Sequence, residues 1–429
     1  MPAVPRILVV QVAALGHELT QRFPGLAAAI GLPFTPCTPP FPAVTCTAQA
    51  TFRTGLDTAG HGVVCNGVFN RSTRAVQFWN QSAALLPPGR IWDALRARGG
   101  RVGILCWQQS LGDSADLILS PAPIHKHGGG MIQDCYTRPP ALYGELRRAV
   151  GRPFNLHRYW GPMASAQSSR WIADATDHVL RSPQKPDLLL TYIPHLDYVL
   201  QKQGPDGPGV AAAVAETARV LGQLADSANQ QGYRLVVWGD YAITPARRPL
   251  FPNRALRQAG LFLTRQVRRH TYPDLYASPA FAMADHQAAH VYVRDPARVG
   301  EVRRALEGIN GIDRVMDHTA CAHTQAGELI LLAAPGAWFA YPWWEDDYEA
   351  PDYATHVDIH SKIGFDPCEL FWGRLFPPGI STDAARVRGT HGRTDWPAAC
   401  ATNLELDAPP PDTLTGLSQA VRTCLSTPR

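Results

Sequence analysis

Six short apolar runs, rich in β-branched residues, are separated by glycine, proline and polar residues. Longer amphipathic stretches lie between several of the runs and predict helices over residues 90–99, 209–232 and 297–309. Strands that alternate with helices are typical of a mainly parallel sheet covered on both faces. We therefore expect an α/β fold with a mainly parallel central sheet. The runs are ILVVQV (7–12), RVGILC (101–106), DLLLTYI (187–193), RLVVWG (234–239), HVYV (290–293) and ELILLA (328–333).

Two polar segments that contain proline, 121–130 and 138–153, interrupt this alternation of strands and helices. They predict an insertion or cap beside the core. The chain has 429 residues, which is more than one hydrophobic core usually serves, so we expect two packed regions. The predicted organisation is a first part of the α/β core at 1–120, an insertion or cap at 121–170, a second part of the core at 171–250, a smaller α/β subdomain at 251–335, and completion of the core with a C-terminal tail at 336–429.

The composition restricts the compartment and the partners. Hydrophobic residues make up 45% and charged residues 18% of the chain, as in folded soluble proteins. The net charge is +4, but the basic residues are scattered, which argues against a nucleic acid polymer as the main partner and suits a small anionic substrate. No run approaches the ~18–20 apolar residues that cross a bilayer. The nine cysteines include no CxxC pair, and we expect a reduced, cytoplasmic protein without a membrane segment.

Polar residues follow several of the predicted strands, where α/β sheets place reactive groups. Asp240 and Tyr241 follow the run 234–239, and Asp197 and Gln201 follow the run 187–193 in PHLDYVLQ. Thr45 heads a run of small and polar residues after Phe-Pro-Ala-Val. A threonine there is either a nucleophile or the N-cap of a helix, and its position alone leaves both open.

The order of these segments resembles the alkaline phosphatase superfamily, in particular its type I phosphodiesterase/nucleotide pyrophosphatase branch. The similar segments are PFPAVTCTAQATFRTGLDTAGHGVVCNGVFNR (40–71), YIPHLDYVLQKQGPD (192–206) and VVWGDYAIT (236–244). The resemblance implies an alkaline-phosphatase-like fold and metal-dependent hydrolysis of a small phosphorylated substrate. It implies that Thr45 is the nucleophile and that Asn66 holds a phosphoryl oxygen; Tyr241 is expected to contact the substrate.

The same resemblance implies one or two divalent cations, held by Asp197, Gln201, Asp240 and either His360 or His391. This chain departs from the pattern at three places. The aspartate of the first strand would lie at Ala13, and two histidine positions carry Gln201 and Tyr241. Because zinc prefers nitrogen and sulfur ligands, these changes allow zinc or a harder cation such as magnesium or manganese. The Asp- and His-rich stretches 285–290 and 346–360 are possible sources of further ligands.

Each functional interpretation has an alternative. Asp197 would be a solvated helix start, Asn66 a turn residue and Tyr241 a packing residue if the chain had no catalytic centre. The alternative to the hydrolase is a pseudoenzyme that binds a phosphorylated metabolite or a partner protein without hydrolysis. The oligomeric state stays open.

Overall fold

A computed structural model describes residues 5–127, 130–373, 379–406 and 409–426. Its central sheet has eight strands, of which the five from β11 to β6 are parallel. The strands β22, β2 and β9 at its two sides pair antiparallel to their neighbours. The prediction of a mainly parallel sheet is therefore confirmed. The order is β2 (Thr35–Cys37), β22 (Ala398–Thr402), β11 (Tyr233–Gly239), β1 (Arg6–Val12), β10 (Leu188–Ile193), β5 (Val102–Leu105), β6 (Leu117–Pro121) and β9 (Cys135–Arg138).

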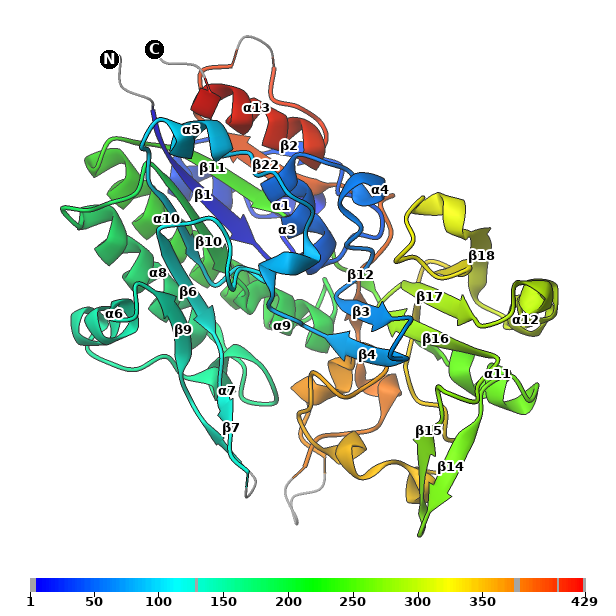
Figure 1. The fold of residues 1–429 in the computed structure, drawn as a ribbon. Helices are drawn as coiled ribbons and strands as arrows, with labels where there is room; N and C mark the ends of the chain where they lie inside the picture. Colours follow the sequence, from blue (N-terminus) through cyan, green and yellow to red (C-terminus); the bar gives the residue numbers. More distant parts are fainter. Residues whose placement is uncertain (1–4, 128–129, 374–378, 407–408, 427–429) are drawn as a thin grey trace.

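Helices cover both faces of this sheet (Figure 1). The helices α8 (Ala166–Arg181) and α10 (Val210–Gln230) lie on one face, and α3 (Thr45–Thr54), α5 (Asp93–Ala97) and α13 (Leu414–Ser426) lie on the other. Strand β1 is central and is buried on both faces from Ile7 to Val12, which explains its continuous apolar run. The helices predicted over 90–99, 209–232 and 297–309 form, each shorter than its pattern.

The last two apolar runs do not join the central sheet. They form β17 (Ala288–Val293) and β19 (Leu329–Ala333) of a second, antiparallel sheet in the order β16–β17–β19–β18, with β16 at Ala280–Asp285 and β18 at Ile312–Asp317. The turn between β16 and β17 is too short for a crossover helix, so these two strands must pair antiparallel. The helices α11 (Pro252–Gln258) and α12 (Val299–Glu307) pack beside this sheet.

The C-terminal tail contains a helix that the Pro-rich sequence did not lead us to expect. Helix α13 packs against α3, and Ser418 Oγ donates a hydrogen bond of 2.6 Å to the Phe52 carbonyl. Gln419 Nε2 donates one of 2.7 Å to the Gly55 carbonyl at the end of α3. The tail therefore helps to fix the helix that begins at Thr45.

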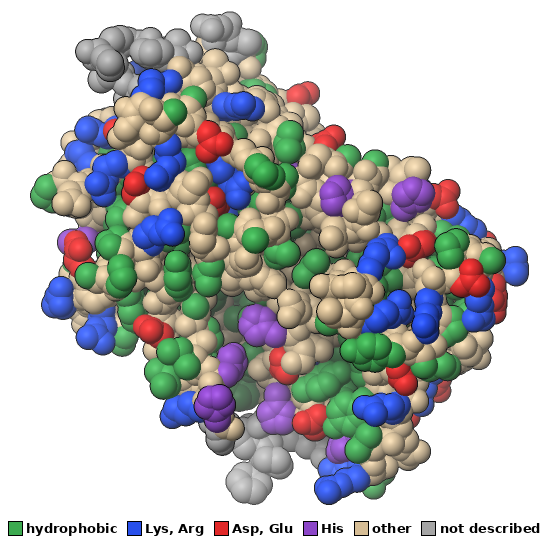
Figure 2. All heavy atoms as spheres, viewed as in Figure 1, with side chains coloured by type: hydrophobic (Ala, Val, Ile, Leu, Met, Phe, Trp, Pro, Cys, Tyr) green, Lys and Arg blue, Asp and Glu red, His purple; other side chains and the backbone are tan. Residues whose placement is uncertain are grey.

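In the described ranges no helix combines the length and apolar character needed to span a bilayer. On the face shown in Figure 2, Lys and Arg side chains are interspersed with Asp and Glu.

The other helices are α1 (His17–Arg22), α2 (Gly25–Ile30), α4 (Thr58–His61), α6 (Leu142–Val150), α7 (Leu156–Tyr159) and α9 (His195–Gln203). The other strands are β3 (Gly67–Asn70), β4 (Ala75–Phe78), β7 (Ile124–His125), β8 (Met131–Ile132), β12 (Thr244–Pro245), β13 (Arg248–Leu250), β14 (Thr264–Val267), β15 (His270–Pro273), β20 (Ala337–Phe339) and β21 (Gly389–Thr390).

Candidate active site

Thr45 is the first residue of helix α3 and faces a buried carboxylate. Its hydroxyl donates a hydrogen bond of 3.2 Å to Asp240 Oδ2. The N-cap of α3 is Val44, in an extended conformation, and its own side chain makes no capping hydrogen bond. The Thr45 side chain therefore does not act as an N-cap, because its hydroxyl bonds to the end of strand β11 instead of to its own helix.

Asp240 follows β11 and is completely buried. Its Oδ2 also accepts a hydrogen bond of 2.8 Å from Gln11 Nε2, and its Oδ1 accepts one of 3.0 Å from the Ala14 amide. Gln11 is held in turn by Gln49 Nε2 on α3, 2.7 Å from Gln11 Oε1. Burial raises the pKa of Asp240 to about 7, so the carboxyl is close to its titration midpoint at neutral pH.

Asp197 and Gln201 lie one turn apart on helix α9, which follows β10. Gln201 Nε2 donates a hydrogen bond of 2.6 Å to Asp197 Oδ2, and the Tyr241 hydroxyl donates one of 3.1 Å to Asp197 Oδ1. Asp197 is 5% exposed, so it is not a solvated helix start. Burial raises its pKa to about 7. Tyr241 therefore links the ends of β10 and β11.

Of the two alternative histidines, His360 and His391, the structure brings only His391 to Tyr241 and Asp197. The ring of His391 stacks on that of Tyr241, and His391 Nδ1 donates a hydrogen bond of 2.8 Å to the Ala43 carbonyl. His360 is exposed instead, with Nδ1 2.9 Å from the Phe78 carbonyl and its ring 6.4 Å from that of His125. The expectation that His360 belongs to the centre has no support in this geometry, because its ring bonds to strand β4.

Asn66 is buried and tied to the start of α3. Its Oδ1 accepts a hydrogen bond of 2.9 Å from the Cys46 amide, next to Thr45. Its backbone amide and Nδ2 donate to the two oxygens of Asp285, at 2.8 Å and 3.1 Å. Asn66 is therefore not a solvated turn residue.

Asp285 is a site residue that the sequence indicated only as part of the stretch 285–290. It lies at the end of β16 in the second sheet and is completely buried. Its neighbour His286 contacts the ring of His391, with centroids 3.6 Å apart. The second sheet thus contributes Asp285 and His286 to the candidate active site. The Asp and His content of residues 285–290 was the sequence signal for this contribution. The other stretch, 346–360, contributes no side chain to the hydrogen bonds described above around Thr45, Asp197, Asp240 and Asn66.

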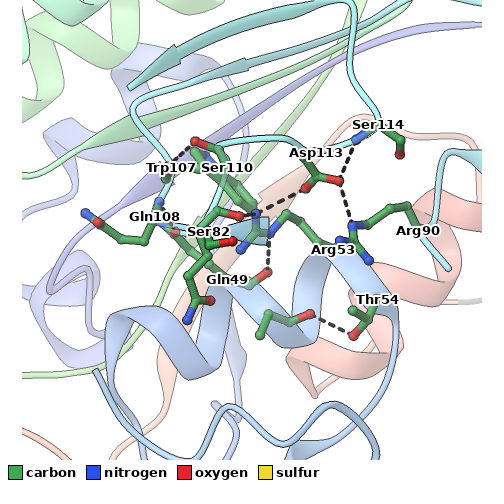
Figure 3. Close-up of polar contacts among 12 residues, drawn as sticks. Gln49, Arg53, Thr54, Ser82, Arg90, Trp107, Gln108, Ser110, Asp113 and Ser114 are labelled. Atoms are coloured by element: carbon green, nitrogen blue, oxygen red, sulfur yellow. Dashed lines mark hydrogen bonds and ion pairs between the residues drawn. The ribbon is translucent and has the colours of Figure 1, made fainter. Parts of the chain in front are cut away.

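A buried charged network holds helix α3 against the loop after β5 (Figure 3). Arg53 Nη1 lies 2.8 Å from the Gln109 carbonyl and 3.4 Å from Asp113 Oδ2, and Arg90 Nε lies 2.9 Å from Asp113 Oδ1. One turn closer to Thr45, Gln49 Oε1 accepts a hydrogen bond of 2.7 Å from the Gln108 amide. These contacts fix the position of α3, and with it the Thr45 hydroxyl.

The first implied cation position consists of Asp197, Gln201 and His391, and two of its donor atoms make no hydrogen bond within the described residues. Gln201 Oε1 and His391 Nε2 are buried and have no hydrogen-bond partner within the described part of the chain. Because His391 donates its Nδ1 proton to a carbonyl, its Nε2 carries a free lone pair, the usual arrangement of a ligating histidine. With the Asp197 carboxylate, these atoms supply two oxygens and one nitrogen.

The second implied position, around Asp240, lacks the carboxylate and the imidazole that the family pattern has at Ala13 and Tyr241. Ala13 offers no donor there, and both oxygens of Asp240 already accept hydrogen bonds from Gln11, Ala14 and Thr45. Over the described ranges, no group of three or more His, Cys, Asp or Glu residues is arranged to hold a metal ion. The groups that contact the Asp240 carboxylate are N–H and O–H donors.

Residues 11–366 match the sequence profile of the type I phosphodiesterase/nucleotide pyrophosphatase family. The sequence matched no curated protein. Among solved structures, phosphonoacetate hydrolase from Sinorhizobium meliloti, in complex with phosphonoformate, is similar with a TM-score of 0.63 and 16% identity, over 99% of this chain and 97% of that one.

Two further similar structures come from mammals. Human ectonucleotide pyrophosphatase/phosphodiesterase 5 gives a TM-score of 0.62 at 13% identity, over 98% of this chain and 94% of that one. An inactive variant of the murine protein, in complex with AMP, gives 0.60 at 12% identity, over 99% and 96%. These similarities confirm the alkaline-phosphatase-like fold expected from the resemblance.

Proposed function

The chain belongs to the type I phosphodiesterase/nucleotide pyrophosphatase family, and we propose that it hydrolyses a small phosphorylated substrate with Thr45 as the nucleophile. The observation that carries this proposal is the 3.2 Å hydrogen bond between the Thr45 hydroxyl and Asp240 Oδ2. A threonine hydroxyl is weakly nucleophilic until a base or a cation activates it. Asp240, when ionised, accepts the Thr45 proton as the oxygen attacks phosphorus.

Two further features suit an anionic phosphoryl group beside Thr45. Thr45 is the first residue of a helix of 10 residues, whose amino end carries partial positive charge. Asn66 Nδ2 uses one hydrogen for Asp285, and we propose that its second hydrogen is donated to a phosphoryl oxygen. Tyr241, which is fixed by Asp197, is the proposed third contact to the substrate.

Asp197, Gln201 and His391 are the proposed holders of one divalent cation. When bound, such a cation neutralises negative charge on the transferring phosphoryl group. The supporting observation is that Gln201 Oε1 and His391 Nε2 are buried without a hydrogen-bond partner in the described residues. Zinc, magnesium and manganese are all compatible with an oxygen-rich set that contains one imidazole.

Hydrolysis of bis(4-nitrophenyl) phosphate and of a phosphate monoester, with each of these cations added, tests the proposal. Thr45→Ala is expected to lower kcat/KM by at least ~100-fold, because it removes the attacking oxygen. Thr45→Ser keeps a hydroxyl and is the matched control, expected to retain most of the activity. Equal activity in wild type and Thr45→Ala would remove Thr45 from the mechanism.

The second candidate is a pseudoenzyme that binds a phosphorylated ligand without hydrolysing it. It is favoured by the hydrogen bonds that already occupy all four carboxylate oxygens of Asp197 and Asp240. Calorimetric titration with phosphorylated ligands separates the candidates. Binding by wild type without turnover of any tested ester supports the pseudoenzyme.

A further inference from the structure

Asp285 holds the neighbouring His286 in one tautomer. His286 Nδ1 lies 2.8 Å from Asp285 Oδ1, so the nitrogen donates its proton to the carboxylate and Nε2 carries a free lone pair. The same carboxylate accepts two hydrogen bonds from Asn66. One buried carboxylate therefore positions both an imidazole and the proposed phosphoryl-binding amide.

The His286 ring lies between two aromatic rings. Its centroid is 4.0 Å from that of Phe365 and 3.6 Å from that of His391. The ring is 3% exposed, and Nε2 is a buried acceptor without a hydrogen-bond partner in the described ranges. His286 also has a φ of 59°, a strained conformation for a residue other than glycine. Buried polar atoms without partners are uncommon and indicate that a water or a ligand completes them.

On the Phe365 side of the stack lies a small hollow, which His286 itself does not line. Its empty volume, including the part open to solvent, is about 200 Å³, and its lining combines aromatic residues with charged ones: Trp79, Trp160, Phe365, Asp358, Lys362, Asp366 and Glu369. His391, on the other side of His286, stacks on Tyr241, which bonds to Asp197. His286 therefore lies between Phe365, on the wall of this hollow, and the side chains around Thr45.

We infer that His286 is a binding residue of this centre, positioned by Asp285, and that its Nε2 accepts a hydrogen bond from a hydroxyl group of the phosphorylated substrate. The inference rests on the proposed function and narrows its substrate class to hydroxylated organic phosphates. Nε2 accepts and does not donate, so its partner is not a phosphoryl oxygen, which is itself an acceptor. A hydroxyl is also less costly to bury than an ammonium group, because Asp285 is already occupied by three donors.

The test compares two ligands that differ only in the hydroxyl, 2-hydroxyethyl phosphate and ethyl phosphate, by calorimetric titration. Wild type is expected to bind the hydroxylated ligand about 3- to 10-fold more tightly, the range of one hydrogen bond. In His286→Asn, which keeps a donor for Asp285 and tolerates a positive φ, this preference disappears. His286→Phe, which keeps the aromatic ring, is expected to lose it as well.

The outcomes separate this inference from the proposed function. Equal affinity of wild type for the two ligands, or an unchanged preference in both variants, would overturn the role of His286 and leave the hydrolase proposal standing. If wild type binds neither ligand, the proposed function fails and this inference fails with it. Thermal unfolding of each variant shows whether a lost preference comes from a folded protein.

Discussion

The phenol ring of Tyr241 lies flat on the imidazole ring of His391, with centroids 3.4 Å apart and an angle of 1° between the planes. Its hydroxyl simultaneously bonds to Asp197. Tyr241 stands where the family resemblance expects a histidine of the second cation position, yet it contacts two side chains of the first. This relationship makes the two positions unequal, because the tyrosine supports the first and supplies no imidazole to the second.

The first prediction is one divalent cation per chain in protein purified without chelator, measured by inductively coupled plasma mass spectrometry. Asp197→Asn is expected to lower the cation content per chain at least ~10-fold, because it removes the carboxylate from the position formed by Asp197, Gln201 and His391. Asp240→Asn is the matched control and should retain the ion. Two ions per wild-type chain, or an equal loss of cation in the two variants, would contradict the prediction that only the Asp197 position holds a cation.

The missing second position can be rebuilt by substitution. Ala13→Asp combined with Tyr241→His restores the two donors that the family pattern has there, next to Asp240. We expect the double variant to gain a second cation, because a carboxylate and an imidazole then face Asp240. Each single variant is the control and should stay at one ion or below. A double variant that gains no ion would show that Gln11 and Ala14 still occupy Asp240.

Stability of the metal-free protein should fall as the pH rises from about 4 to about 7. Burial raises the pKa of Asp197 and of Asp240 from 3.8 to about 7. In that window the folded protein holds protons that the unfolded chain has released, so the free energy of unfolding decreases by roughly 1.4 kcal/mol per pKa unit for each group. Below about pH 4 both states are protonated and the effect ends.

Urea unfolding in EDTA at about pH 5 and about pH 7.5 measures this effect. Asparagine mimics the protonated carboxyl group, so Asp240→Asn should gain stability relative to wild type as the pH rises. A difference between the two proteins that does not change with pH would show that Asp240 is ionised throughout.

The network at the far end of helix α3 should dominate the stability of that helix. Arg53 and Asp113 are at most 1% exposed, and Arg90 is 8% exposed. Asp113→Ala leaves two guanidinium groups without their carboxylate and is expected to cost about 3–5 kcal/mol. Glu301→Ala, which breaks the exposed pair with Arg298, should cost far less than Asp113→Ala, because solvent screens this pair. Similar costs for the two variants in urea unfolding would show that the buried pair is not needed.

Several features of the site follow from local sequence. The segments around Asp197 and Asp240 each combine an apolar strand with the polar residue that follows it, and parallel strands bring such residues to one edge. The spacing of Asp197 and Gln201 places them on one helix face, and the structure confirms their contact. The division into residue ranges and the catalytic roles of these residues stay predictions.

Other features depend on contacts between distant parts of the chain. The His391 ring is held beside Tyr241 by its hydrogen bond to the carbonyl of Ala43, 348 residues away, whereas the exposed His360 bonds to the carbonyl of Phe78. Asp285 contacts Asn66 across 219 residues, which a pattern of apolar and polar positions does not encode. The helix at Leu414–Ser426 was missed because prolines before it dominate the local signal.

The sequence by itself determined three helices, four of the five parallel core strands and the identity of the polar residues after two of those strands, because side-chain periodicity and turn residues act over a few positions. Only the tertiary structure decided that two strands fold into a separate antiparallel sheet, that His391 rather than His360 joins Tyr241, and that hydrogen-bond donors surround Asp240. Those outcomes depend on which buried groups meet after the chain has folded, where each polar atom must find a partner that is far away in sequence.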